Sequence, residues 1–189
     1  MFRKTAFFLL SFVILLTGCS AKNPSTQKAL DLRVKLMEAG GCSFTADITA
    51  DYDQRVYTFT VTCDYQAGQE AKITVTEPEE IAGISAKISA DTARLEFDGL
   101  ELEFGQMANG LVSPMEACWV LTQSWNSGYI HSVGADEELM RITCLDGYGD
   151  KELTVDTWLD EAGIPVHGEI TYEGVRRLAL DITEFRWDD

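Results

Sequence analysis

The chain has 189 residues, of which 46% are hydrophobic, and its 15 basic and 31 acidic residues give a net charge of -16. This length and apolar content fit one globular domain of common size. The acidic excess argues against nucleic acid and against an anionic lipid surface as partners, because phosphate groups are held by clusters of Lys and Arg.

The amino terminus has the charge order of a secretory signal. Arg3 and Lys4 precede an almost uninterrupted apolar run from Ala6 to Leu16, which is typical of a signal peptide. The run is shorter than the roughly 20 apolar residues that a transmembrane helix needs. Leu16-Thr17-Gly18-Cys19 then resembles the bacterial lipobox, whose cysteine receives a diacylglyceryl group before cleavage on its amino side. We expect a lipoprotein signal peptide at residues 1–18 and lipidation of Cys19; an ordinary secretory signal is the alternative.

This anchor predicts where the protein resides. Acyl chains on Cys19 would hold it at the extracytoplasmic face of the cell membrane, since each buried methylene contributes roughly 0.8 kcal/mol. Residues 19–27 are expected to form a short polar tether, followed by one folded domain over residues 28–189. Removing residues 1–18 takes away Arg3 and Lys4 and no acidic residue, so the net charge changes from -16 to about -18.

Four cysteines follow Cys19 in the chain: Cys42, Cys63, Cys118 and Cys144. An even number in an exported chain favours disulfides. Residues 42–50 and 55–63 alternate like strands, and a four-residue hairpin loop over 51–54 would place Cys42 opposite Cys63. We therefore expect these two to be cross-strand neighbours, either bonded or as free thiols. A second bond between Cys118 and Cys144 has no spacing rule behind it.

Two segments carry helix signals. Ser25 can cap a helix over residues 26–39, which Gly40 and Gly41 would end. Its expected apolar stripe is Ala29, Leu30, Val34 and Met37. The second helix begins with Ser113-Pro114-Met115-Glu116, which predicts a capping box, and continues to Trp125 with apolar residues on more than one face.

The rest of the chain reads as short antiparallel strands. Alternating segments separated by Gly, Pro or Asp cover residues 71–78, 84–90, 93–99, 100–105, 139–146, 151–160, 165–174 and 175–185. In the last pair, Gly168 and Ile170 face Leu180 and Leu178 only if the hairpin contains a bulge. The predicted fold class is α+β: a curved antiparallel β-sheet, or half-barrel, with helices packed on its concave face.

Three segments carry a family resemblance: "TVTEPEEIAGISAKISADTARLEFDGLELEFG", "SPMEACWVLTQSW" and "LTVDTWLDEAGIPVHGEITYEGVRRLALDITEF". In order and spacing they resemble the LolA-like lipoprotein carrier superfamily, including its membrane-tethered members among clostridial germination lipoproteins. The resemblance implies a half-barrel whose concave apolar face takes an acyl chain or a lipoprotein. One departure matters: the soluble carrier of that superfamily has no lipid of its own, whereas Cys19 is expected to carry one.

The expected ligand cavity is apolar. Its candidate lining residues are Phe44, Phe59, Ile73, Val75, Phe97, Trp119 and Leu121. The rival function is a tethered adaptor that binds another envelope protein, such as a cell-wall or germination enzyme, and has a filled interior. A cavity of a few hundred Å³ between sheet and helix distinguishes the two, since ligand pockets run about 300 to 1,000 Å³.

Catalytic signals are weak throughout the sequence. His131 and His167 are far apart and lack a partner pattern, and we expect both at the surface. The sequence contains no nucleophile elbow, P-loop or zinc-protease motif. We expect a protein that is not an enzyme, with no cofactor, no metal and no nucleic acid partner.

Overall fold

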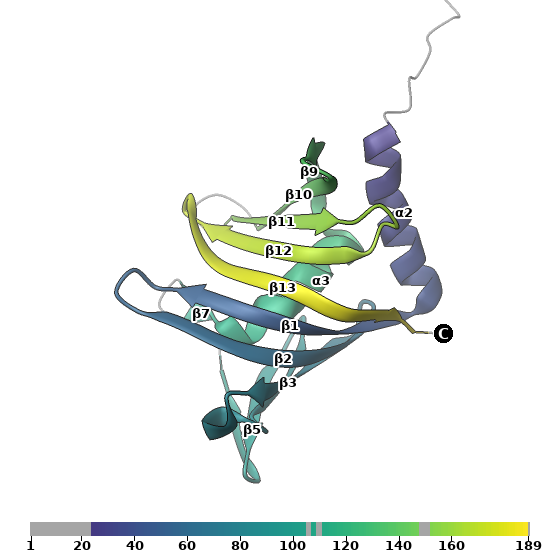
Figure 1. Cartoon of the computed structure of the whole chain (residues 1–189). Coiled ribbons are helices and arrows are strands. Elements are labelled where there is room, and N and C mark those ends of the chain that lie inside the picture. Colours follow the sequence, from purple (N-terminus) through teal and green to yellow (C-terminus); the bar gives the residue numbers. More distant parts are fainter. Residues whose placement is uncertain (1–23, 105–106, 109–110, 148–151, 189) are drawn as a thin grey trace, which may run out of the picture.

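The computed structural model describes residues 24–104, 107–108, 111–147 and 152–188 (Figure 1). The predicted signal peptide and the lipidation site Cys19 lie outside these residues. None of the described helices combines the length and the apolar character that crossing a bilayer requires.

Two α-helices and thirteen strands make up the described chain, with two short 3-10 turns at Glu79–Ile81 (η1) and Pro114–Glu116 (η2). The helices are α2 (Pro24–Ala39) and α3 (Ala117–Ser127). The strands are β1 (Gly41–Asp51), β2 (Val56–Gln66), β3 (Glu70–Glu77), β4 (Ser85–Ser89), β5 (Ala93–Phe97), β6 (Leu100–Glu103), β7 (Met107–Ala108), β8 (Leu111–Val112), β9 (Tyr129–Asp136), β10 (Leu139–Asp146), β11 (Leu153–Leu159), β12 (Pro165–Tyr172) and β13 (Val175–Trp187).

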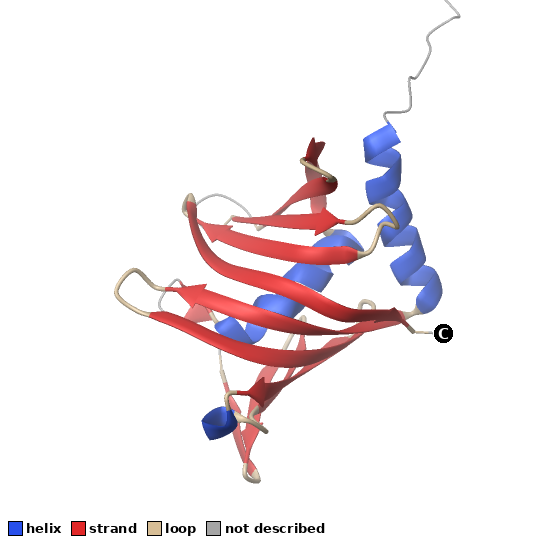
Figure 2. Cartoon of the chain, viewed as in Figure 1, coloured by secondary structure: helices blue, strands red, loops and turns tan. Residues whose placement is uncertain are grey.

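Eleven of the strands form one open antiparallel sheet, in the order β6-β5-β4-β3-β2-β1-β13-β12-β11-β10-β9. The sheet curves around α3, while α2 stands at one end of the strands (Figures 1 and 2). Strands β6 and β9 are its two edges, so the barrel is not closed. The predicted curved half-barrel of the α+β class is confirmed. Strand β9 was not predicted, because its sequence "YIHSVGAD" alternates poorly and most of its side chains are exposed.

The core lies between α3 and the concave face of the sheet. Leu121 of α3 is fully buried against Gly168 of β12, where an added Cβ would lie 2.8 Å from both methyl carbons of the leucine. The indole nitrogen of Trp125 donates a hydrogen bond to the Thr157 hydroxyl of β11 at 2.8 Å. A glycine under the helix and a polar contact beside it therefore fix how deeply α3 sits in the half-barrel.

Helix α2 buries a different face from the expected one. Ala29, Leu32 and Leu36 are buried, whereas the predicted stripe residues Leu30, Val34 and Met37 are 41%, 51% and 61% exposed. The helix begins at Pro24, so residues 24–27, which were expected in the tether, are helical. Proline suits the first turn because that turn needs no intrahelical N–H donor.

The orientation of α2 follows from Arg33. Its guanidinium donates to the carbonyl oxygens of Trp125 at 2.8 Å and Gly128 at 2.6 Å, at the carboxyl end of α3. Those carbonyls have no partner within their own helix, and a cation there also complements the helix dipole. This contact holds Arg33 against α3 and turns the stripe of Leu30, Val34 and Met37 toward solvent.

The register of the first hairpin differs from the prediction by two residues. Cys42 lies opposite Tyr65, and Cys63 lies opposite Phe44. The loop comprises residues 52–55 instead of 51–54, since Asp51 pairs with Val56. Cys42 and Cys63 are therefore not directly opposed, and all four cysteines after Cys19 are free and buried, so neither predicted disulfide is present.

The register of the last hairpin is confirmed. Gly168 faces Leu180 and Ile170 faces Leu178, and the register then shifts by one residue before the turn. The irregularity leaves Arg177 as the extra residue of β13.

Candidate functional site

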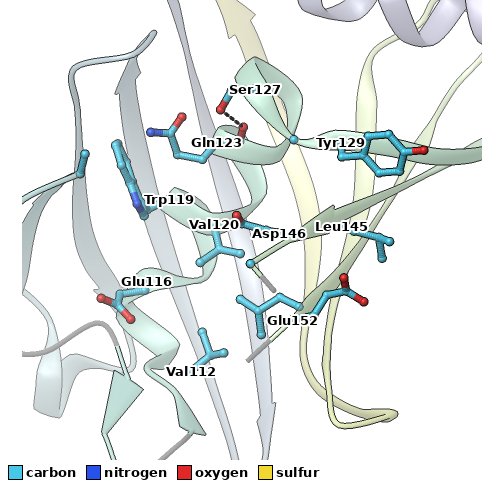
Figure 3. A pocket seen from close by; sticks show the side chains of 14 residues that line it. Val112, Glu116, Trp119, Val120, Gln123, Ser127, Tyr129, Leu145, Asp146 and Glu152 are labelled. Carbon is cyan, nitrogen blue, oxygen red and sulfur yellow. Dashed lines mark hydrogen bonds between the residues drawn. The ribbon is translucent and has the colours of Figure 1, made fainter. Parts of the chain in front are cut away.

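An open cavity of about 800 Å³ lies beside α3, between the turn after β4 and the ends of β10 and β11. Figure 3 shows it with its lining side chains. The lining residues are Ala90, Val112, Glu116, Trp119, Val120, Gln123, Ser127, Gly128, Tyr129, Leu145, Asp146, Gly147, Glu152 and Leu153.

One side of the cavity is formed by α3. Trp119 and Val120 give it apolar surface, and Gln123 a polar group one turn further along the helix. The indole of Trp119 stands edge-on to the ring of Tyr65 on β2, with centroids 6.0 Å apart. The Tyr65 hydroxyl donates to the side-chain carbonyl of Gln123 at 3.2 Å. These contacts to the sheet position both side chains at the cavity.

The facing side comes from β10 and β11. Leu145 and Leu153 supply apolar surface there, and Asp146 pairs with Leu153 across the two strands. Asp146 and Glu152 are exposed. Every charged side chain that the described residues contribute to the cavity is acidic. The cavity is thus mixed, with apolar walls and an acidic rim, rather than the wholly apolar one that was expected.

Glu116 occupies an unusual position at the start of α3. Its exposed fraction is 0%, and neither carboxyl oxygen has a hydrogen-bond partner among the described residues. Burial raises the pKa of this carboxyl to about 8, an effect that the nearby Ser113 N–H offsets only in part. Near neutral pH the group is therefore mostly protonated, because the charged form loses its hydration.

The predicted capping box is not formed. Ser113 makes no side-chain hydrogen bond to the helix start, and the Glu116 N–H donates to the Ser113 carbonyl at 2.9 Å. The Ser113 N–H is near enough to the Glu116 carboxyl to lower its pKa in part, but its geometry is not that of a hydrogen bond. The sequence pattern located the helix start correctly, but Glu116 is a fully buried residue there and not a formed cap.

Tyr52 is a titratable residue whose pKa is affected by Glu116. Its hydroxyl donates to the Val112 carbonyl at 2.7 Å. Burial raises the pKa of Tyr52, Arg177 lowers it in part, and Glu116 raises it further. Arg177 itself is paired with Asp53 at 3.1 Å. The phenol therefore stays neutral near pH 7 and is already committed as a donor.

The seven expected lining residues are distributed over three environments. Trp119 lines the cavity. Phe44, Ile73, Val75 and Leu121 are buried in the filled core, and Phe59 packs against that core. Phe97 is 44% exposed near the β6 edge. Alternation identified residues that face inward, but Glu116 was missed as a site residue because its motif also has an ordinary capping role.

Three of the cysteines gather in the core under α3. The pKa of the Cys63 thiol is raised well above its usual value, first by its contact with Cys118 and then by burial. Burial also raises the pKa of Cys42, and the charges of Asp188 and Cys118 raise it further. Burial raises the pKa of Cys144 to about 11. Within the described ranges no group of ligating side chains is arranged to hold a metal ion.

The two histidines do not meet. His131 is exposed on β9. His167 is on β12, with its Nδ1 2.7 Å from an Asp181 oxygen and its Nε2 3.5 Å from Glu169. Neither lines the cavity.

No protein-family model matches the chain, and no relative is found among curated proteins. Solved structures with a similar arrangement include a LolA superfamily protein from Nitrosomonas europaea, with 10% identity, a TM-score of 0.43, and coverage of 85% of this chain and 94% of that chain. The lipoprotein LppX of Mycobacterium tuberculosis has 12% identity and a TM-score of 0.43, covering 89% and 97%. A chain in the complex of the CwlD amidase with the GerS lipoprotein from Clostridioides difficile has 11% identity and a TM-score of 0.45, covering 91% and 99%. With identities of 10 to 12% and TM-scores below 0.5, these likenesses carry no conclusion about the family, ligand or partner of this chain.

Proposed function

We propose that this chain is a membrane-anchored lipoprotein, held at the extracytoplasmic face by lipid on Cys19, that binds an apolar chain in the cavity beside α3. The ligand class is an acyl chain or the acylated part of a lipoprotein. It acts by binding and presentation, not by catalysis. Cys19 enters this proposal from the lipobox pattern of residues 16–19.

The cavity is the observation that carries the binding role. Its volume of about 800 Å³ lies within the range of about 300 to 1,000 Å³ typical of small-molecule sites. Val112, Trp119, Val120, Leu145 and Leu153 give it apolar surface on more than one side. An adaptor with a filled interior has no need of such a space.

Native mass spectrometry tests this role. The chain from Ser20 onward keeps every residue that the structure describes and can be purified from its host without detergent. We expect a second population heavier by the mass of one lipid, which Trp119→Ala reduces because it removes a wall of the cavity. Trp158→Ala is the matched control, since Trp158 is outside the cavity. A protein that carries no lipid and binds no added amphiphile would overturn the proposal.

A second function is favoured by the β5–β6 hairpin. Phe97, Leu100 and Leu102 are 44%, 76% and 63% exposed there, which is more apolar surface than an edge hairpin needs. A tethered adaptor would use such a surface to bind an envelope protein. A photo-crosslinking residue at position 100, in place of Leu100, would give a discrete protein adduct in the envelope if this function holds, and no adduct otherwise.

A further inference from the structure

We propose that the cavity selects a ligand with a positively charged polar end, an ammonium group carried on an apolar chain, and that Glu116 receives this charge. The inference rests on the proposed function, since it concerns the polar end of the chain that lies beside α3.

The charges around the cavity are of one sign. Asp146 and Glu152 are its charged lining residues near neutral pH, Glu116 adds a carboxyl that is mostly protonated there, and no Lys, Arg or His of the described residues lines it. A carboxylate or phosphate headgroup would meet the like charge of Asp146 and Glu152, while an ammonium would meet complementary charge. Acidic rim residues alone do not make a site, because Asp146 and Glu152 are exposed and hydrated.

Glu116 supplies the independent observation. It lines the cavity, is fully buried, and has two carboxyl oxygens without a hydrogen-bond partner among the described residues. A buried polar group without any hydrogen bond costs on the order of 1 to 3 kcal/mol, so such groups nearly always have a partner in the protein, in ordered water or in a bound ion. A cationic group in the cavity would act as the charge partner of this carboxyl when it is ionised.

Among the described residues no cationic side chain pairs with Glu116, and the nearby Ser113 N–H offsets the effect of its burial only in part. Tyr52 faces Glu116 from the loop between β1 and β2, but its hydroxyl is donated to the Val112 carbonyl. Arg177 of β13 acts on Tyr52 and pairs through Nη1 with Asp53, and its buried Nε makes no hydrogen bond to Glu116. Across the cavity stand Asp146 and Glu152, which cannot neutralise a carboxylate. A cation on the ligand would therefore supply the positive charge that no described side chain brings to Glu116.

The proposal predicts how binding depends on pH. Burial raises the pKa of Glu116 to about 8 in the free protein, and a bound cation favours the ionised carboxylate. Binding then releases a proton, so affinity for a cation of fixed charge rises from pH 7 to pH 9. Tyr52, whose pKa is raised above its usual 10, remains neutral over this interval.

The test compares two amphiphiles of equal chain length, dodecyltrimethylammonium and laurate, titrated below their micellar concentrations into the chain from Ser20 onward. Tryptophan fluorescence reports binding at pH 7 and pH 9. We expect the cation to bind at least about tenfold more tightly than laurate, which corresponds to roughly 1.4 kcal/mol. Glu116→Gln should remove most of this preference and the rise with pH. Glu161→Gln, an exposed acid in the turn after β11, is the control and should keep both.

The outcomes separate the two proposals. Equal or tighter binding of laurate, or an unchanged preference in a folded Glu116→Gln variant, overturns the inference while leaving the binding role in place. Failure of both amphiphiles to bind overturns the binding role itself. An acetylated and amidated Leu-Lys-Leu peptide is then tested as a competitor of the cationic amphiphile. Competition would indicate that the ammonium belongs to a lysine of a protein ligand, and lack of competition that it belongs to the headgroup of an amphiphile.

Discussion

Leu121 of α3 lies directly on Gly168 of β12, and the absence of a Cβ at position 168 is what allows the contact. An added Cβ would be 2.8 Å from both methyl carbons of the leucine, which is itself fully buried. The depth of α3 in the half-barrel, and with it the space left beside Trp119 and Val120, is therefore set by one glycine in the sheet.

Gly168→Ala should lift α3 away from the sheet. Because Leu121 must move, we expect a loss of about 1 to 3 kcal/mol in the free energy of unfolding, as for other overpacked cores. Urea denaturation measures this. Gly134→Ala on β9 is the control, since nothing lies within 4 Å of a Cβ there. Equal stability of the two variants would contradict the contact.

Glu116→Gln should change how stability depends on pH. The pKa of Glu116 is raised in the folded state to about 8 from a usual 4.5, so the folded chain binds more protons than the unfolded chain between these values. The contribution of protonated Glu116 to the free energy of unfolding is complete below pH 4.5 and is lost as the pH rises to about 8.

The measurement is urea denaturation at several pH values from 5 to 9. Relative to the Gln variant, the original chain should lose a few kcal/mol over this interval, since one pKa unit corresponds to about 1.4 kcal/mol. A constant difference between the two proteins at every pH would show that Glu116 does not titrate as a buried group.

The four cysteines after Cys19 should be unreactive thiols in the folded protein. They are buried and free. Burial raises the pKa of Cys42 and Cys144, and contact with Cys118 followed by burial raises that of Cys63, so these three carry little thiolate at neutral pH. Alkylation of the chain from Ser20 onward should modify none of them in buffer and all four in guanidinium without reductant. Recovery of only two reactive thiols after unfolding would reveal a disulfide.

Cys19→Ala should release the protein from the membrane fraction or leave an unprocessed precursor. Transfer of a diacylglyceryl group needs the cysteine sulfur, and loss of the acyl chains removes the main source of membrane affinity. Cell fractionation with a blot against the folded domain gives the result. Cys42→Ala serves as the control, since it should stay membrane-bound. A Cys19→Ala protein that is processed and still firmly bound would refute the anchor.

The sequence predicted the curved sheet well because inward and outward residues alternate along most strands. Alternation shows which face of the sheet a residue is on, but it does not fix which residues are opposite each other. The first hairpin is shifted by two residues, and such a shift leaves Cys42, Phe44 and Cys63 on the same face, so alternation cannot detect it. In the last hairpin the register was correct, because Gly168 and Leu180 could be matched only through a bulge.

The helices show a different limit. Helix α2 has two apolar stripes, and the buried one contains Leu32 and Leu36 because Arg33 contacts the end of α3. That contact joins residues about 90 positions apart and leaves no local pattern. The lining of the cavity also leaves no local sequence pattern, because its extent depends on where α3 crosses the sheet. Only Trp119 of the expected lining residues is there.

The most direct test of the binding role is contact quenching of Trp119 by a dodecyltrimethylammonium chain carrying bromine atoms near its methyl end. Bromine quenches an indole only when the two touch, and Trp119 lines the cavity while Trp158 does not. The proposed site predicts saturable quenching that is largely lost in Trp119→Phe and retained in Trp158→Phe. Quenching that persists in Trp119→Phe, or that never saturates in the original chain, would contradict an apolar ligand bound beside α3.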